Sequence, residues 1–473
     1  MISNRLLICL LATGLLFGCA SRPINQPIAQ VDLQSGYRPN LLIPKRPNND
    51  LSTLFILSFS GGGTRAAALS YGVLEELQQT TIQVDGEQRR LIDEVDLITG
   101  VSGGSFTALA YALYGDQLFD VYEERFLKRD VQGALMWRVF NPLNWGKLLS
   151  GNYGRSELAA EYYDEILFEG ATFADLLERE GPVAIATGTE ISSGARLSFY
   201  QQDFDLLCSD LGSVRLSRAA ATSSAVPVVL TPVTLSNYGG TCGYEYPPWV
   251  EDILAIDEHD RPAGRALARY RDMNMFQDSD RLPFVHLVDG GVSDNIGLRG
   301  VMEFLEEASL SSQYAKETGV SQLRRFVVII VNARSDVSDD WGQRESPPGL
   351  TSQLLQSSGV PIERYSFETI ELLKDRMAVM SWRRDLKIAE ARLAGANLAE
   401  AEASVPKIDT YMVEVSFDHV NDPQKRSHLK NLPTSFVLPA EDVDLLREVA
   451  GELLRQSPDY QTLLQELSGG SDE

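Results

Sequence analysis

A short apolar run that leads into glycines and then into a segment of helical character occurs twice in this chain. It occurs first at residues 54–59, which are followed by Ser60, three glycines and an apolar segment of helical character. It occurs again at residues 95–99, which lead into Gly100 and a second apolar segment. Similar runs lie at residues 182–187, 284–288 and 326–331. Buried strands that alternate with helices predict an α/β fold, a sandwich built around a mainly parallel sheet.

The organisation of the chain follows from changes in composition. A stretch rich in proline, asparagine and glutamine at residues 19–50 indicates a tether. We assign residues 51–335 to the α/β domain, with a charged surface insertion at about 243–282 that shows little periodicity. Residues 336–473 are expected to form a helical region packed on the same domain. Its expected helices lie at about 363–397 and about 440–467.

The N-terminus resembles an export signal rather than part of the fold. An apolar run at residues 6–18 is too short to span a membrane as a helix. It ends in Leu-Phe-Gly before Cys19, which resembles a bacterial lipobox, so residues 1–18 would be removed and Cys19 lipidated. An ordinary cleaved signal that contains a cysteine is the alternative. The lipobox, followed by Ala20, implies a lipoprotein anchored to the bacterial outer membrane, on its periplasmic face.

Charge and cysteine usage limit the possible partners. Arg and Lys number 42 against 66 Asp and Glu, and the net charge of −24 would repel nucleic acid. The four histidines are scattered and no Cys and His cluster at metal spacing, so we predict no metal and no cofactor. Without Cys9 and Cys19 the mature chain keeps Cys208 and Cys242. In an oxidising compartment these two form a disulfide, and two buried free thiols are the alternative.

The second glycine-rich stretch carries a candidate nucleophile. Gly100, Ser102 and Gly104 match G-x-S-x-G, in which a serine lies on a sharp turn between a strand and a helix. The glycines leave room around the hydroxyl, and the helix N-terminus favours a developing negative charge. A glycine-rich turn without a catalytic role is the alternative. The apolar strand before the motif and the apolar helix after it favour Ser102 as a nucleophile.

The first glycine-rich stretch is a candidate anion-binding loop. The amides of Gly61, Gly62 and Gly63 can approach a ligand oxygen closely, as an oxyanion hole requires. Arg65 can brace the loop or hold a phosphate. A nucleotide-phosphate loop is the rival interpretation, but the spacing G-x-G-x-x-G fails because Ala66 stands where its last glycine belongs.

A candidate base follows the apolar run at residues 284–288. Asp289 precedes Gly290 and Gly291, which leave its carboxylate accessible. At the end of a strand it can reach a serine on a neighbouring strand end and accept the hydroxyl proton. An aspartate in a β-turn is the alternative for this motif alone.

In this order, these stretches resemble the patatin-like phospholipase family. That family has a glycine-rich loop ending in Arg, then G-x-S-x-G, then D-G-A or D-G-G, which correspond here to Arg65, Ser102 and Asp289. Residues 221–227 resemble its Ala-Ser-x-Ala-x-Pro segment near the active site. The resemblance covers about residues 54–331. It departs from the family at Ala66, where the family often has glycine, and in the long gap between the serine and the aspartate.

The resemblance implies both architecture and chemistry. The fold would be a three-layer α/β/α sandwich, with residues 51–335 as the catalytic domain. The activity would be hydrolysis of acyl esters in phospholipids or related acyl lipids through a Ser–Asp dyad. Ser102 would form an acyl-enzyme and Asp289 would shuttle the proton. The remaining site residues would hold the oxyanion (Gly61, Gly62 and Gly63) or support the site (Arg65, Gly100, Gly104, Gly290 and Gly291).

Two alternatives belong to other functional classes. One is an esterase or peptidase with a triad, in which Asp289 orients His419 or His428 and the histidine is the base. The other is a lipid-binding lipoprotein that keeps the fold without turnover.

The stretch between Arg125 and Lys147 combines cations with aromatic and apolar residues in an otherwise acidic chain. This combination suits a membrane surface, with rings among the headgroups and cations near the phosphates. A core segment rimmed by cations is the alternative. We therefore expect two membrane contacts, the lipid on Cys19 and this stretch.

Overall fold

The computed structural model describes residues 21–46, 49–84, 86–257, 259, 264–335, 345–347, 349–405 and 407–469. The predicted signal and the lipidation site at Cys19 lie outside these residues. Eight strands form the central sheet: β2 (Thr53–Phe59), β5 (Leu97–Gly100), β6 (Val183–Glu190), β7 (Arg196–Ser198), β9 (Val233–Ser236), β10 (Phe284–Asp289), β11 (Arg325–Asn332) and β12 (Asp409–Ser416). Two small two-stranded sheets pair β1 (Gln26–Pro27) with β8 (Ser209–Asp210), and β3 (Thr81–Val84) with β4 (Glu87–Arg90).

The central sheet is mainly parallel. Its order is β12-β11-β2-β5-β6-β10-β9, and β7 pairs with β6. The neighbours from β12 through β6 are parallel, whereas β7, β9 and β10 are added antiparallel. The buried runs of β2 and β11 are apolar on both faces, as expected for parallel strands covered on each side. The predicted α/β class with a mainly parallel sheet is confirmed.

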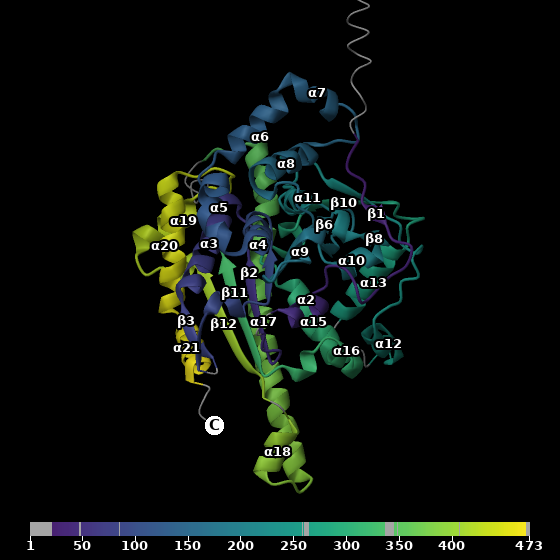
Figure 1. Cartoon of the computed structure of the whole chain (residues 1–473), viewed down its shortest axis with the longest axis vertical. Coiled ribbons are helices and arrows are strands. Elements are labelled where there is room, and N and C mark those ends of the chain that lie inside the picture. Colours follow the sequence, from purple (N-terminus) through teal and green to yellow (C-terminus); the bar gives the residue numbers. More distant parts are fainter. Residues whose placement is uncertain are drawn as a thin grey trace, which may run out of the picture.

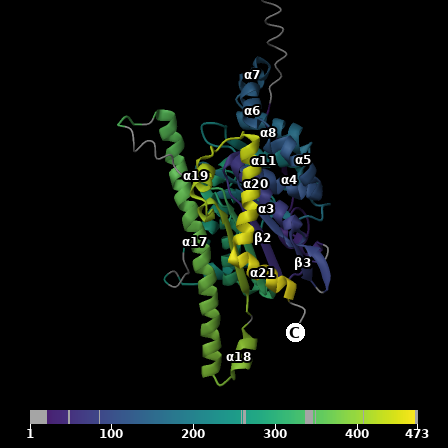
Figure 2. The ribbon, with the colours of Figure 1, turned by 90° about the vertical axis from the view of Figure 1, so that its left-hand side faces the viewer.

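Helices cover both faces of the sheet, which makes three layers (Figures 1 and 2). Alternate residues of β2 explain this, because Phe55 and Leu57 belong to one core cluster and Ile56 to the other. The first cluster is covered by α3 (Gly63–Gln79), α4 (Gly103–Tyr114) and α20 (Ala440–Gln456). The second is covered by α15 (Arg299–Leu310) and by α17 (Leu350–Leu393), which contributes Ile370 and Leu373.

The remaining helices connect the strands or lie at the ends of the molecule. They are α2 (Pro39–Leu42), α5 (Leu118–Tyr122), α6 (Val131–Phe140), α7 (Pro142–Leu148), α8 (Arg155–Tyr163), α9 (Phe173–Leu176), α10 (Gln201–Leu206), α11 (Leu216–Ser223), α12 (Pro248–Ala255), α13 (Arg265–Gln277), α14 (Gly291–Asp294), α16 (Ser312–Glu317), α18 (Leu398–Ser404), α19 (Pro423–Asn431) and α21 (Pro458–Gly469). Among the helices that the structure describes, none combines the length and the apolar character that a membrane span requires.

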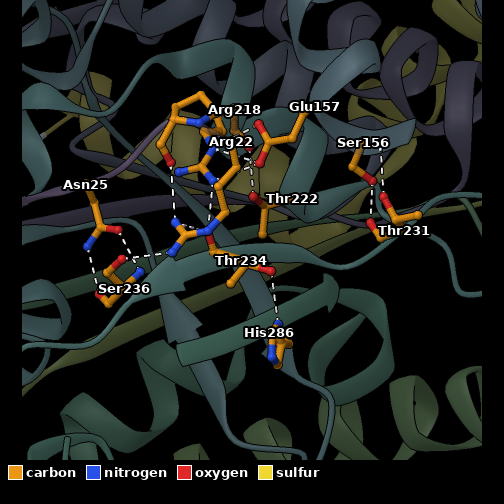
Figure 3. A network of polar contacts seen from close by, with 11 residues as sticks. Arg22, Asn25, Ser156, Glu157, Arg218, Thr222, Thr231, Thr234, Ser236 and His286 are labelled. Atoms are coloured by element: carbon orange, nitrogen blue, oxygen red, sulfur yellow. Dashed lines mark hydrogen bonds and ion pairs between the residues drawn. The ribbon is translucent and has the colours of Figure 1, made fainter. Parts of the chain in front are cut away.

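The segment expected to be a tether contacts the domain at several points along its described length. The Arg22 guanidinium donates to the carbonyl oxygen of Thr234 and to the Ser236 hydroxyl (Figure 3). The buried Arg38 pairs with Asp205 at 2.7 Å. Pro27 belongs to β1, which pairs with β8, and Pro39 begins α2, so the described prolines are not confined to a free linker. Local composition does not reveal these long-range partners.

The charged insertion at 243–282 forms α12 and α13, which lie on the domain. Trp249 of α12 and Phe276 of α13 are buried, and Asn237 donates to the carbonyl oxygen of Phe276 at 2.9 Å. Just before the insertion, Cys208 and Cys242 form a disulfide in the structure.

The C-terminal region contains a strand as well as helices. Residues 336–473 were expected to be helical, but β12 pairs with β11 along its whole length and forms an edge of the central sheet. The last expected helix is divided into α20 and α21 at Ser457, which is extended before Pro458. The long helix α17 starts earlier than expected, and only part of its apolar face is buried: Phe367 and Met380 are exposed.

Candidate active site

Ser102 lies at the turn between β5 and α4. The strand ends at Gly100 and the helix begins at Gly103, so the backbone reverses direction within two residues. Ser102 has φ 48° and ψ −119°, a conformation that residues other than glycine rarely adopt. Its amide donates to Ser223 Oγ at 2.9 Å and its carbonyl oxygen accepts from the Ser105 hydroxyl at 2.6 Å. Strain of this kind persists at functional sites where the surroundings fix it.

The two glycine-rich loops touch one another. A Cβ atom on Gly103 would lie only 2.0 Å from the carbonyl oxygen of Gly63, so no side chain fits there. A Cβ atom on Gly104 would lie 2.6 Å from the carbonyl oxygen of Phe59. The glycines of the motif therefore allow the serine turn to pack directly against the candidate oxyanion loop.

Asp289 reaches Ser102 across β6. It ends β10 opposite Gly188, and Ala186, two residues earlier in β6, pairs with Gly100. The sequence predicted the serine and the aspartate on neighbouring strands. The structure corrects this, since β6 lies between them and β10 is antiparallel to it. Position 290 requires glycine because the backbone of β6 passes close to it: an added Cβ would lie 2.5 Å from the carbonyl oxygen of Thr187.

The Ser102 side chain lies close enough to the buried Asp289 carboxyl to lower the pKa of that carboxyl. Each residue is only 7% exposed. Burial raises the pKa of the Asp289 carboxyl to about 7, although the hydrogen bond from the Gly291 amide, at 2.8 Å, and the Ser102 side chain lower it in part. A carboxyl group with a pKa near neutrality suits proton transfer to and from a substrate.

The segment at 221–227 contacts both catalytic candidates. Ser223 binds the Ser102 amide through its hydroxyl and the Gly290 amide through its carbonyl oxygen, at 3.2 Å. The carbonyl oxygen of Ala225 accepts the Asp289 amide at 3.0 Å. The sequence motif placed this segment near the active site. The structure adds that it binds the backbones of both turns.

The candidate oxyanion loop offers fewer donors than expected. The Gly61 amide donates to the carbonyl oxygen of Asn295 at 3.0 Å, so it is already engaged. Among the described residues, the amides of Gly62 and Gly63 have no acceptor. Gly62 and Gly63 have φ of 143° and 61°, which glycine adopts readily. Asn295 escaped the sequence analysis, because nothing in the sequence indicates that its carbonyl oxygen binds the loop.

Arg65 braces the loop. It is buried, and it donates to the carbonyl oxygens of Ala333 and Leu432 and, at 3.0 Å, to the Thr434 hydroxyl. Burial lowers its pKa to about 10. All three guanidinium nitrogens of Arg65 donate hydrogen bonds to protein atoms. Of the two roles considered from the sequence, this arrangement favours bracing the loop over binding a phosphate.

The two histidines of the triad alternative contact groups other than Asp289. His428 binds Asp442 at 2.6 Å, and His419 contacts the carbonyl oxygen of Glu414 at 3.1 Å; both are exposed. Neither is among the groups that shift the pKa of Asp289. Within the part of the chain that the structure describes, no group of three or more His, Cys, Asp or Glu could hold a metal ion.

Comparison with known proteins identifies the family. The sequence model of the patatin-like phospholipase family matches residues 57–302, more than half of the chain. The chain belongs to the patatin-like phospholipase family. The match begins within β2, includes the serine turn, β6 and β10, and ends within α15.

Solved structures similar to this patatin-like protein include two chains of low identity. Human GIVD cytosolic phospholipase A2 is 12% identical, with a TM-score of 0.43 over 91% of this chain and 62% of that one. VipD from Legionella pneumophila is 12% identical, with a TM-score of 0.25 over 90% of this chain and 71% of that one. The patatin-like chain thus spans about 62% of the length of the human enzyme. A search of curated proteins finds no match.

Proposed function

We propose that this protein is a serine acyl-hydrolase that cleaves acyl esters of phospholipids or related lipids, with Ser102 and Asp289 as a dyad. The single observation that carries the proposal is that Ser223 binds both the Ser102 amide and the Gly290 amide, which sets the strained serine turn beside the buried Asp289. Membership of the patatin-like phospholipase family supports the substrate class. The strained backbone of Ser102 supports its role as the nucleophile.

In the first half of the reaction, Asp289 accepts the proton of the Ser102 hydroxyl while Oγ attacks the acyl carbonyl carbon. The carbonyl double bond opens and its oxygen becomes an oxyanion. When the tetrahedral intermediate collapses, the ester bond breaks and the leaving alcohol takes the proton from Asp289. The acyl group stays on Ser102 as an ester.

In the second half, Asp289 accepts a proton from water, and the water oxygen attacks the acyl carbon. Collapse of this intermediate breaks the bond to Ser102 Oγ, which recovers the proton from Asp289. The fatty acid leaves and the dyad returns to its starting state. A carboxyl with a pKa near 7 is suited to both directions of this proton transfer.

The oxyanion is assigned to the amides of Gly62 and Gly63. The Gly61 amide already donates to the carbonyl oxygen of Asn295, and it can keep this bond if the amides of Gly62 and Gly63 bind the oxyanion. The contact between Gly63 and Gly103 brings these amides beside the turn that carries Ser102. The N-termini of α3 and α4 meet at the same place, and their dipoles favour negative charge there.

The membrane contact is proposed for the hairpin formed by α6 and α7 (residues 131–148), which projects at one end of the molecule (Figure 1). Asn141 ends α6 and caps α7 through the Leu143 amide, so the two helices are joined by a tight turn. Trp137 is 69% exposed and Leu143 is 84% exposed. Other large apolar side chains exposed here are Met136, Phe140, Trp145 and Leu149.

Most cations of this region are already paired within the protein, which leaves few of them for lipid phosphates. Four of them form ion pairs within the protein: Arg125 with Glu169, Lys128 with Glu123 and Asp444, Arg138 with Glu165, and Lys147 with Glu161. The apolar side chains are therefore the proposed contact, and insertion should depend little on anionic lipid.

We also propose the lipid anchor on Cys19, with the protein at the periplasmic face of a bacterial outer membrane. Arg22 follows Cys19 by three positions and is bound to Thr234 and Ser236. It lies beside Glu157 of α8, the helix that follows the hairpin (Figure 3). Three residues span at most about 11 Å, so a lipid on Cys19 would hold the membrane near the base of the hairpin.

Release of fatty acid from mixed phospholipid vesicles tests the proposed chemistry. We expect release by the wild type, and none above background for Ser102→Ala or Asp289→Asn with unchanged circular dichroism. His419→Ala and His428→Ala should retain activity. Loss of activity in a folded histidine variant would favour the triad. A wild type that binds vesicles without releasing fatty acid would favour the lipid-binding alternative.

A further inference from the structure

An exposed apolar loop adjoins the candidate active site. The valine loop, defined as residues 226–230, follows α11 and precedes β9. Val228 is 64% exposed and Val229 is 55% exposed. Exposed apolar side chains that stand next to a catalytic pair are available to a ligand, whereas scattered ones need no explanation.

The backbone of Val228 is strained. Its φ is 74°, and the other described residues besides glycine with a positive φ are Ser102, Glu169 and Cys208, none of them β-branched. A β-branched residue at positive φ is a true outlier, because its Cβ substituents crowd the backbone. The exposed side chain gains little packing in return. Such strain is retained where function requires the side chain at that place.

One end of the valine loop is bound to the turn of the base. Ala225, which precedes the loop, accepts the Asp289 amide, and Val226 donates to the carbonyl oxygen of Ser224 at 2.8 Å. Within the loop, the Leu230 amide donates to the carbonyl oxygen of Val226 at 3.0 Å. Val228 is therefore three residues from a direct contact with the Asp289 backbone.

The other end is bound to α8, which follows the hairpin. Arg155 donates to the carbonyl oxygen of Val228 at 3.1 Å. Thr231, just after the loop, accepts the Ser156 amide at 3.2 Å and accepts the Ser156 hydroxyl through its carbonyl oxygen (Figure 3). A Cβ on Gly154 would lie 2.1 Å from the Thr231 hydroxyl. The loop is thus held between the base and the helix that continues from the membrane-facing hairpin.

We propose that the valine loop is the subsite that contacts the fatty acyl chain of the substrate. This inference rests on the proposed function. A chain that leaves the membrane beside the hairpin passes α8 and then Val228 and Val229 before its carbonyl reaches Ser102. The loop is apolar and hydrogen-bonded at both ends, so it can remove acyl methylenes from water with little further ordering of the protein chain.

The test compares hydrolysis of 4-nitrophenyl laurate with that of 4-nitrophenyl acetate. The ratio of the two kcat/KM values should fall by about 4-fold or more in Val228→Gly and in Val229→Ser, which is the effect of about one buried methylene. Glycine adopts the φ of residue 228 freely, so Val228→Gly should also raise Tm. Higher stability together with a weaker preference for the long chain would separate a substrate contact from a folding role.

Glu169→Gly is the matched control, because Glu169 also has a positive φ, 52°, but belongs to neither the loop nor the catalytic turns. Its laurate-to-acetate ratio should equal that of the wild type. Unchanged ratios in Val228→Gly and Val229→Ser would overturn the inference, and Val229→Ser decides alone if the glycine variant does not fold. Ester hydrolysis that persists in Ser102→Ala would overturn the proposed function instead, whatever the ratios are.

Discussion

The backbone amide of Ser102 donates a hydrogen bond to Ser223 Oγ at 2.9 Å. The carbonyl oxygen of the same Ser223 accepts the Gly290 amide, next to Asp289. Ser223 ends α11, so one helix terminus binds the turns of the proposed nucleophile and base. The relative position of these two turns therefore depends on a residue that takes no part in proton transfer.

Replacing Ser223 with alanine should lower kcat by about 10- to 100-fold with little change in KM, because displacement of a nucleophile by a fraction of an ångström has effects of this size. The unpaired Ser102 amide should also lower the free energy of unfolding by about 1–3 kcal/mol. Steady-state kinetics with a soluble ester and urea denaturation measure the two effects. Ser224→Ala is the matched control, because that hydroxyl donates to Ala220 within the helix. Equal kcat in both variants would contradict the role of Ser223.

The pH dependence of activity should follow the Asp289 carboxyl. Only the ionised carboxylate can accept the Ser102 proton, and burial raises its pKa to about 7. We therefore expect kcat/KM for a soluble ester to rise with pH, with a midpoint near 7. A pH–rate profile of the free enzyme measures this midpoint. A flat profile between about pH 5 and pH 8 would contradict the assignment of the base.

Asp289 should also affect stability in a pH-dependent way. Its pKa is raised from 3.8 to about 7 on folding, so the folded state binds more protons in that interval. The carboxyl then destabilises the fold increasingly as pH rises from about 4 to about 7. Asp289→Asn should thus be more stable than the wild type, by a margin that grows by about 2–3 kcal/mol between pH 5 and pH 8. Urea denaturation at both pH values measures this margin, and a constant margin would contradict the shifted pKa.

Gly290→Ala should destabilise the protein and reduce activity. The added Cβ would lie 2.5 Å from the Thr187 carbonyl oxygen, and the resulting backbone shift should cost about 1–3 kcal/mol. Gly359→Ala is the comparison, since a Cβ there meets nothing within 4 Å and lies in α17. That variant should gain about 0.5–1 kcal/mol. If urea denaturation shows similar effects for the two, the close packing at Gly290 is refuted.

The α6–α7 hairpin should contribute to vesicle binding through its tryptophans. Trp137→Ala with Trp145→Ala should weaken sedimentation with phosphatidylcholine vesicles several-fold, because two large apolar side chains lose their burial in lipid. Hydrolysis of a soluble ester should not change. Trp382→Ala is the matched control, since Trp382 is similarly exposed, on α17. Equal vesicle binding by the double variant and the wild type would exclude the hairpin as the contact.

The family and the α/β class were predictable because they depend on local patterns. An apolar run followed by closely spaced glycines predicts a strand, a tight turn and a helix from a short stretch of sequence, as around Ser102. The order of these units then identified the family, which the family match confirms. The catalytic roles of Ser102 and Asp289 stay predictions, as do the lipid on Cys19 and the cellular location.

The features that escaped prediction depend on contacts between distant parts of the chain. Strand direction is not encoded in an apolar run, so the antiparallel β10 was not foreseen. The pairing of Arg138 with Glu165, and the binding of the Gly61 amide by Asn295, follow only from the folded chain. The buried Arg38 likewise lies in a stretch whose composition resembles a linker, but its partner Asp205 is far away in the sequence.

Labelling with a fluorophosphonate probe, followed by peptide mass spectrometry, identifies the nucleophile of the proposed Ser102–Asp289 dyad. We expect one adduct in the wild type, on the peptide that contains Ser102. We expect no adduct in Ser102→Ala and much slower labelling of Asp289→Asn at the same pH. An adduct on another residue, or equal labelling rates for the wild type and Asp289→Asn, would contradict the Ser102–Asp289 dyad.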